Sequence, residues 1–191
     1  MRFAYFIALF FLFLGTGYAQ ENGVYKDLKL AIEAGDSVKV LVLRKQKLTE
    51  IPVEVYQLKN LEELDLRKNE ITVIPDEISQ LRNLKVLDVS RNKVDTISVE
   101  LGSLVKLTSL HLEKNEFSVL PKSIGHLSEL EYLNIDYTNV KEIPTEISQC
   151  KKLQLFNAGH SYLDEEEAKR VRNLLPEDCV KIFPLTCKCN S

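Results

Sequence analysis

The sequence of 191 residues lacks most of the features by which an enzyme or a nucleic-acid-binding protein is recognised. Its 25 Lys and Arg are outnumbered by 28 Asp and Glu, which gives a formal net charge of −3. A nucleic-acid partner normally requires a clustered basic excess, so this balance gives no support to one. The sequence also has no Gly-rich phosphate loop, no HExxH motif and no calcium-binding loop.

Histidine is scarce, and none of the three residues suggests catalysis. His111, His126 and His160 have no Ser or Cys partner in a recognisable nucleophile motif. His126 falls on an outer segment of the repeat described below, where we expect it to be solvent-exposed. The sequence therefore predicts a protein that is not an enzyme and that needs neither a cofactor nor a metal.

Long hydrophobic runs are absent except at the N-terminus, "MRFAYFIALFFLFLGTGYA". The apolar run from Phe3 to Leu14 falls short of the roughly 20 residues that a membrane-spanning helix needs. Arg2 before the run, and Gly17 and Ala19 after it, are typical of a signal peptide. We therefore expect cleavage after Ala19, export to the cell surface, envelope or medium, and no membrane span afterwards. A membrane anchor is the alternative, and the lack of a Cys after the run argues against a lipoprotein.

What the sequence does have is a strict period of 23 residues. Six segments align without insertion or deletion, and they begin at Val38, Leu61, Leu84, Leu107, Leu130 and Leu153. Apolar residues at positions 4 and 6 of each segment alternate as in a short strand, whereas those at positions 14, 18 and 21 have helical spacing. Such a unit cannot close a core alone, because its apolar row must face the next copy. The period predicts an α/β solenoid with a parallel sheet on one side and helical or 3-10 returns on the other.

The repeated pattern LxxLxLxxNxLxxLPxxIxxLxx resembles the leucine-rich repeat in its 23-residue form, over residues 38 to about 163. The segments "VYKDLKLAIEAGDSVKVLVL" and "NLLPEDCVKIF" further resemble the caps of exported bacterial leucine-rich repeat proteins, particularly those of spirochaetes. The resemblance implies a curved solenoid that binds other proteins through its concave sheet, with host attachment as a suspected role. Ser98 in place of Pro and Cys150 in place of Leu depart from the pattern.

The expected organisation follows the period. Residues 1–19 are the signal peptide, 20–37 an N-terminal helical cap, 38–163 six repeats of which the last is partial, and 164–191 a C-terminal cap. The N-terminal helix should run from about Tyr25 to Ala34 and end at Gly35. The C-terminal cap should contain a helix that begins with a capping box of Asp164 and Glu167, then a short strand and a Cys-containing tail.

Position 9 of the repeat is expected to hold the bends together. An Asn turned inward at a tight bend can donate to and accept from backbone groups that no sheet satisfies. This column reads Gln46, Asn69, Asn92, Asn115, Thr138 and Ser161. Its weakening to Thr138 and Ser161 suggests that the C-terminal units are less tightly tied.

Candidate binding residues are those that flank the strand core and point to the concave face. Aromatic and amide residues gather toward the C-terminal repeats: His111, Tyr132, Asn134, Tyr137, Asn157 and His160. Charged residues occupy the earlier repeats: Asp65, Asp88 and a basic column of Lys45, Lys68, Arg91 and Lys114. Glu62, Asp65, Asp88 and Glu113 are expected to compensate this basic column. It is either a solvated edge or a site for an acidic ligand, such as a sulfated glycan or an acidic protein loop.

The four cysteines divide into two kinds. Cys150 occupies a column otherwise held by Leu and is expected to be buried. Cys179 could form a disulfide with Cys187 or Cys189 of the polar tail, and a metal site is not expected from the Cys-x-Cys pair alone.

The sequence thus predicts an exported, monomeric, non-enzymatic module that binds a protein through its concave sheet, with a host or extracellular-matrix protein as partner. A self-associating structural protein of the cell envelope is the alternative. A ubiquitin-ligase-type effector is disfavoured, because no catalytic domain fits beside the repeats.

Overall fold

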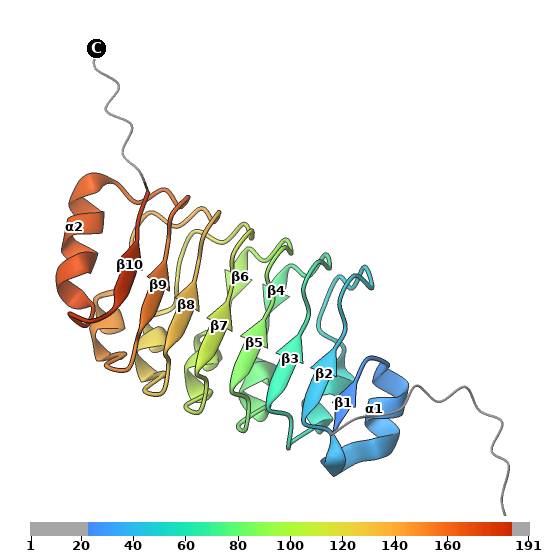
Figure 1. The fold of residues 1–191 in the computed structure, drawn as a ribbon. Helices are drawn as coiled ribbons and strands as arrows, with labels where there is room; N and C mark the ends of the chain where they lie inside the picture. The colour runs from blue at the N-terminus through green and yellow to red at the C-terminus, as the bar shows by residue number, and fades with distance from the viewer. Residues whose placement is uncertain (1–22, 185–191) are drawn as a thin grey trace, which may run out of the picture.

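The computed structural model describes residues 23–184 and shows a stack of coils closed by a helix at each end (Figure 1). The expected signal peptide and the tail residues Cys187 and Cys189 lie outside the described residues. One layer of the stack is a parallel sheet of eight strands in the order β1-β2-β3-β5-β7-β8-β9-β10. These are β1 (Val24–Tyr25), β2 (Val40–Val42), β3 (Glu63–Asp65), β5 (Val86–Asp88), β7 (Ser109–His111), β8 (Tyr132–Asn134), β9 (Leu155–Asn157) and β10 (Val180–Ile182).

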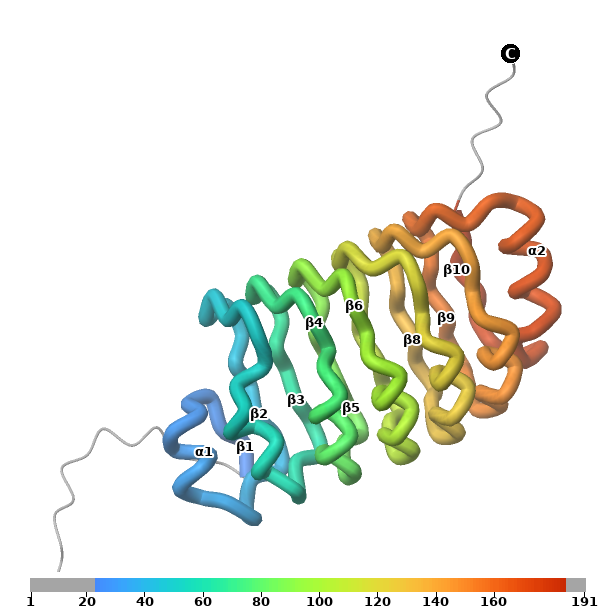
Figure 2. The backbone as a smooth tube through the Cα atoms, turned by 180° about the vertical axis from the view of Figure 1, so that it is seen from behind, coloured from blue at the N-terminus to red at the C-terminus, as the bar shows by residue number. Residues whose placement is uncertain are grey.

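The other layer consists of the returns, seen from behind in Figure 2. They are 3-10 helices at Val53–Gln57, Asp76–Gln80, Val99–Ser103, Lys122–His126 and Thr145–Gln149, and a further 3-10 turn, Gly35–Ser37, follows the first α-helix. A two-stranded parallel sheet, β4 (Val73–Ile74) and β6 (Thr96–Ile97), joins two neighbouring coils beside the returns. The predicted α/β leucine-rich repeat solenoid is thus confirmed, with the returns in their 3-10 form.

The 23-residue period sets the register of the sheet. Leu64 pairs with Leu41 on one side and Leu87 on the other, and the series continues through Leu110 and Leu133. The side chains of these leucines are fully buried. Each buried Leu contributes about 1.5–3 kcal/mol relative to an exposed one. Because every leucine packs on its copies in the adjacent coils, stability arises between units rather than within one.

Proline and serine start the returns. Pro52, Pro75, Pro121 and Pro144 each immediately precede a 3-10 helix, where their fixed φ is compatible with the turn. Ser98 stands at the same place in the third unit, and its hydroxyl accepts a hydrogen bond from the Glu100 N–H at 3.0 Å. At this return, a side-chain cap from Ser98 therefore replaces the fixed backbone angle that Pro provides in the other units.

Glycine allows two returns to pack unusually closely. A Cβ atom on Gly102 would lie 2.5 Å from the Ser123 carbonyl oxygen, and one on Gly125 would lie 2.5 Å from the Glu146 carbonyl oxygen. No larger residue fits at these contacts without a shift of the neighbouring backbone.

The N-terminal cap differs from the expectation. Helix α1 spans Leu28–Ala34, and Asp27 caps it by accepting a hydrogen bond from the Leu30 N–H. Tyr25 is not helical but belongs to β1, which extends the sheet by pairing with β2. Gly35 ends the helix with a φ of 54°, as the sequence predicted.

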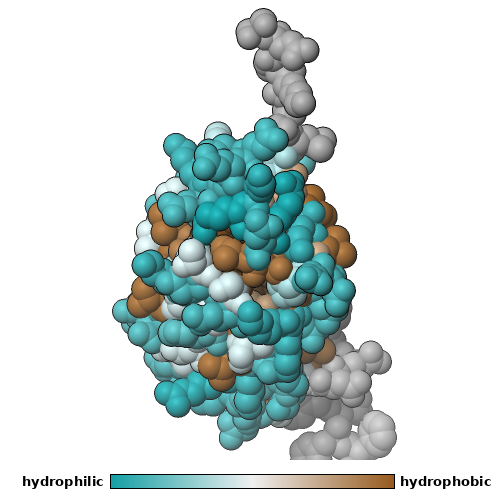
Figure 3. Space-filling model, turned by 90° about the vertical axis from the view of Figure 1, so that its left-hand side faces the viewer, coloured by the Kyte–Doolittle hydropathy of each residue, from teal (hydrophilic) through white to brown (hydrophobic). Residues whose placement is uncertain are grey.

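The C-terminal cap contains helix α2 (Glu165–Leu174), which covers the last coil (Figure 1). Asp164 caps the helix by accepting from the Glu167 N–H at 2.8 Å. The reciprocal half of the expected capping box is missing, because the Glu167 carboxylate instead accepts from the Ile143 N–H and pairs with Arg170. Ala168 and Val171 are buried against the stack, and the surface at this end is mainly hydrophilic (Figure 3).

Cys150 is fully buried, as predicted, and its thiol donates to the Ile124 carbonyl oxygen. Cys179 is buried and forms no disulfide within residues 23–184, and its expected pairing with Cys187 or Cys189 stays a prediction. His126 is exposed on its return. Over residues 23–184, no helix is long and apolar enough to cross a membrane.

Candidate binding surface on the concave face

Every repeat leaves its strand through the same sharp bend, and position 5 begins it. A side-chain oxygen at this position accepts a hydrogen bond from the backbone N–H two residues later, at 3.0–3.1 Å, in Asp65, Asp88, Asn134 and Asn157. This is the Asx-turn geometry that favours Asp and Asn at bends. The four residues were expected as binding residues, but they also have this structural role, and Asp88 and Asn134 are largely buried.

The residues at position 8 of the first five repeats adopt a left-handed backbone conformation. Lys45, Lys68, Arg91, Lys114 and Tyr137 have φ values between 55° and 59°. Residues other than Gly seldom adopt this conformation. Here it turns the chain so that the position-8 side chains project from the bend, and all five are exposed.

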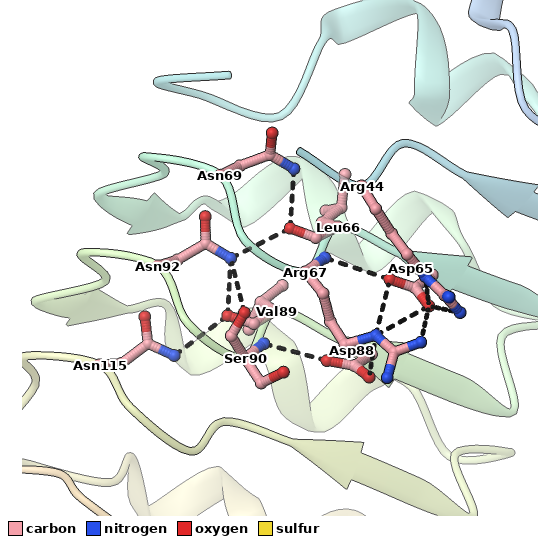
Figure 4. A network of polar contacts seen from close by, with 10 residues as sticks. All are labelled: Arg44, Asp65, Leu66, Arg67, Asn69, Asp88, Val89, Ser90, Asn92 and Asn115. Carbon is pink, nitrogen blue, oxygen red and sulfur yellow. Dashed lines mark hydrogen bonds and ion pairs between the residues drawn. The ribbon is translucent and has the colours of Figure 1, made fainter. Parts of the chain in front are cut away.

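Asparagine at position 9 satisfies the backbone groups that the bend leaves open (Figure 4). The amide nitrogen of Asn69 donates to the carbonyl oxygens of Leu43 and Leu66, both at 2.8 Å, and its oxygen accepts from the N–H groups of Gln46 and Leu48. Asn92 and Asn115 also donate to a carbonyl of their own unit and to one of the preceding unit. The Asn ladder therefore connects adjacent coils.

The ends of this column differ from its centre. Thr138 and Ser161 each donate one hydrogen bond, to the carbonyl oxygens of Ile135 and Ala158 within their own units. The side chain of Gln46 is exposed, and only its backbone N–H joins the ladder. Thr, Ser and Gln therefore do not reproduce the two-coil bridge that Asn makes.

Position 7 supplies two arginines that the sequence analysis missed. Arg44 contacts Asp65 at 2.5 Å, and Arg67 contacts Asp65 at 2.9 Å and Asp88 at 3.1 Å (Figure 4). Burial alone would raise the pKa of Asp65, but hydrogen bonds from Arg44 and Arg67 outweigh it and hold this pKa below its usual range. The sequence contains a pattern that could have predicted these ion pairs, since side chains at positions 5 and 7 lie on the same face of an extended chain.

Within the described part of the chain, the carboxylates expected to compensate the basic column form no ion pairs with Lys45, Lys68 or Arg91. Asp65 and Asp88 pair with the arginines of position 7, and Glu62 pairs with Lys39 and Lys85. Among residues 23–184, no carboxylate forms an ion pair with Lys45, Lys68 or Arg91. These cations are exposed and free to bind a ligand.

The cations border a hollow of about 560 Å³, which we call the basic hollow. Its lining residues are Arg44, Lys45, Arg67, Lys68, Ser90, Arg91 and Glu113. Five positive side chains thus face one carboxylate, and Asp65 and Asp88 bind the two arginines. Five positive against three negative charges leave the site with a net charge of +2.

Glu113 is the exceptional member of this lining. Its Oε2 atom is buried and has no hydrogen-bond partner among the described residues. Burial raises the pKa of Glu113, and the negative charge of Asp88 raises it further. The one carboxylate that lines the hollow is therefore poorly solvated.

Aromatic rings form two pairs in the C-terminal half of the face. The rings of His111 and Tyr132 lie 4.6 Å apart on β7 and β8. The rings of Tyr137 and His160 stack at 4.1 Å with an interplanar angle of 10°. His160 is held by Asp136, whose carboxylate contacts its Nδ1 atom at 2.9 Å.

Lys114, which the sequence placed in the basic column, lies in this aromatic region. Its Nζ atom lies 5.0 Å from the centre of the Tyr137 ring, within the range of a cation–π contact. Lys114 is not among the residues that line the basic hollow. The basic column thus contains three cations that line the hollow and one, Lys114, that contacts an aromatic ring.

Apolar residues of the last strands extend the aromatic region, and sequence reasoning missed two of them. Val180 pairs with Leu155, and Ile182 pairs with Asn157, so their side chains continue the rows of Tyr132 and Asn134. Val180 is 57% exposed and Ile182 is 43% exposed. They follow the C-terminal helix, outside the repeat period, and so no column predicted them. We call the two ring pairs with Leu155, Val180 and Ile182 the aromatic patch.

Comparison with known proteins agrees with the geometry. The family description "Leucine rich repeat" matches residues 36–94, and a second match of the same description covers residues 106–127. No curated protein matches the sequence significantly.

Solved structures include a leucine-rich repeat protein of Leptospira interrogans, with 32% identity and a TM-score of 0.69, over 78% of this chain and 43% of that one. An internalin of Listeria monocytogenes gives 18% identity and a TM-score of 0.66, over 87% of this chain and 53% of that one. The ectodomain of an Arabidopsis thaliana receptor kinase, in complex with CASPARIAN STRIP INTEGRITY FACTOR 2, gives 28% identity and a TM-score of 0.50, over 66% of this chain and 19% of that one.

The chain thus spans about half, or less, of the length of each of these proteins. Leucine-rich repeat proteins generally mediate protein–protein interaction and typically serve as non-enzymatic scaffolds. The repeat matches, the parallel sheet and the 3-10 returns together show that this chain folds as a leucine-rich repeat solenoid.

Proposed function

We propose that this protein is exported and binds a host or extracellular-matrix protein through its concave sheet, without catalysing a reaction. The observation that supports this function best is the aromatic patch. Tyr137 is 49% exposed although its ring already stacks on His160. An exposed aromatic patch of this kind is typical of the centre of a protein interface.

The stacked arrangement favours binding because it lowers the entropic cost. A free Tyr side chain must be immobilised when a partner covers it, whereas the Tyr137 ring is already confined between His160 and Lys114. Pre-organised contact groups leave more of the interaction energy for affinity. The Tyr132 ring is half-buried beside His111, so the same argument applies to both pairs.

The test is to measure binding of the purified protein to a panel of extracellular-matrix and cell-surface proteins. The variant Tyr132→Ala with Tyr137→Ala should weaken binding about 30-fold or more, since the loss of a single hot-spot residue already costs about 2 kcal/mol or more. Tyr162→Ala is the matched control, because Tyr162 is 65% exposed and belongs to neither ring pair. Equal affinity of the double variant and the natural protein would exclude the aromatic patch as the binding site.

Self-association within the cell envelope is the second candidate, and the exposure of Val180 and Ile182 favours it. Apolar residues on the outermost strand of a sheet are a potential contact for another copy. Sedimentation should then show an oligomer that grows with concentration, whereas the host-binding proposal expects a monomer. A variant with Val180→Lys and Ile182→Lys should dissociate such an oligomer.

A further inference from the structure

The concave face carries two chemically different regions side by side. The basic hollow lies where β2, β3 and β5 end, and the aromatic patch lies on β7 to β10 and the bends that follow β8 and β9. Both regions belong to one continuous sheet, so a single ligand can contact both.

The hollow offers cations that are not used for folding. Lys45, Lys68 and Arg91 form no ion pair among the described residues, and they project from successive bends. Neighbouring strands lie about 4.8 Å apart, so these charges repel one another unless an anion lies between them. Arg44 and Arg67, which Asp65 and Asp88 hold in place, form a fixed base beneath them. A ligand with negative groups would relieve the repulsion without displacing an existing ion pair.

Two observations favour an acidic peptide over a sulfated glycan. The hollow has a net charge of only +2 and contains the Glu113 carboxylate, which opposes a densely charged polyanion. Farther along the same sheet, the surface of Leu155, Val180 and Ile182 suits apolar side chains, which a sulfated glycan lacks.

The spacing also suits a peptide. The strands at the centre of the hollow, β3 and β5, lie three strand positions from β8 and β9, which is about 14 Å at ~4.8 Å per step. An extended chain advances about 3.3 Å per residue, so about four residues separate the two regions.

We propose that the basic hollow binds an acidic, carboxylate-bearing segment of the same protein partner whose apolar residues cover the aromatic patch. This inference rests on the proposed function, and it adds the chemistry and the orientation of the bound segment. The acidic end lies toward α1 and the apolar end lies toward α2.

The first experiment titrates the purified protein with a fluorescein-labelled octaglutamate peptide at low salt. Octaglutamate should bind, and binding should weaken several-fold as salt rises above about 0.1 M, where exposed charges are screened over about 10 Å. The variant Lys45→Gln, Lys68→Gln and Arg91→Gln should weaken binding about tenfold or more, because each exposed ion pair contributes roughly a factor of two to five. No binding by the natural protein, or equal binding by this triple variant, would overturn the proposal.

The matched control removes the same charge elsewhere. Lys122, Lys141 and Lys151 are exposed and do not line the hollow. Their replacement by Gln should leave octaglutamate affinity within about twofold of the natural value, since distant exposed charges are largely screened. An equal loss in this control would show that net charge, and not the hollow, controls binding, and would refute the proposed site.

Glu113→Gln gives a change of opposite sign. It removes one negative charge from the hollow at nearly constant shape, so octaglutamate should bind about two- to fivefold more tightly. Weaker binding would contradict the electrostatic argument.

A heparin oligosaccharide of matched charge tests the competing ligand class. Tighter binding of octaglutamate supports a peptide ligand, whereas tighter binding of heparin would replace it by a sulfated glycan. The variant Tyr132→Ala with Tyr137→Ala keeps the basic hollow and should still bind octaglutamate. Binding of the protein partner by this double variant tests only the proposed function, whereas its binding of octaglutamate tests only the basic hollow. The two proposals can therefore fail separately.

Discussion

Replacing one ladder asparagine should destabilise the protein far more than replacing the threonine that occupies the same column. Asn92 donates to the carbonyl oxygens of Leu66 at 3.1 Å and Val89 at 2.8 Å, and it accepts from the Ile71 N–H at 3.1 Å. Asn92→Ala leaves the buried Ile71 N–H without its partner, whereas the carbonyl oxygens of Leu66 and Val89 each lose one donor and keep another, from Asn69 and Asn115. A buried unsatisfied group costs about 1–3 kcal/mol. The two lost hydrogen bonds to carbonyl oxygens that keep another donor add about 0.5–1.5 kcal/mol each, and relaxation and water entry reduce the sum, so we expect a loss of about 2–4 kcal/mol in the free energy of unfolding.

Thr138→Ala is the matched comparison. Thr138 donates only to the Ile135 carbonyl oxygen, at 2.7 Å, so its loss should cost about 1 kcal/mol. The assay is urea denaturation followed by circular dichroism, with equal slopes required before midpoints are compared. If Asn92→Ala lowers the free energy of unfolding no more than Thr138→Ala does, hydrogen bonds from the Asn ladder to the backbone do not contribute to stability as described.

Three further predictions concern the hollow, the returns and the buried thiol. The folded-state pKa of Glu113 is raised, so ionisation of this carboxyl opposes folding. Glu113→Gln should therefore stabilise the protein at pH 7, and the gain should vanish below the unfolded pKa of about 4.3, where both states are protonated. A gain in unfolding free energy that stays constant across pH would contradict this. Gly125→Ala should cost about 1–3 kcal/mol in thermal unfolding because its Cβ would meet the Glu146 carbonyl oxygen, whereas an unchanged Tm would show that the returns can separate. Burial raises the pKa of Cys150 to about 11, so iodoacetamide should modify it only after unfolding, as followed by peptide mass spectrometry, and rapid native labelling would refute its burial.

The period was sufficient to predict the fold because the residues that define the sheet repeat at a fixed spacing. Leu64 and its copies fall in register since each unit has the same length and packs on its neighbours. The cap strand β1 escaped prediction because a two-residue pairing of Val24 and Tyr25 with β2 leaves no periodic signal.

The candidate site was harder to predict than the fold. Position 7 could have been read as part of the concave face, and Arg44 and Arg67 would then have been found. Asp65 pairs with Arg67 of its own repeat and with Arg44 of the preceding repeat, and the pattern within one repeat does not show which cations of a neighbouring repeat lie within reach. The same is true of Lys114, which contacts a ring in the next unit rather than a carboxylate. The binding role of these residues remains a prediction.

The constant length of the repeat has a consequence for the way such a surface can change. One additional 23-residue unit between β7 and β8 would preserve the packing of the coils on either side of it, because each unit contacts only its neighbours, but it would separate His111 from Tyr132 and Lys114 from Tyr137. It would move the basic hollow and the aromatic patch apart by one strand spacing, about 4.8 Å. Insertion of a unit at this place would therefore lengthen the partner segment that the surface accommodates, while the basic hollow and the stacked Tyr137–His160 pair stay as they are.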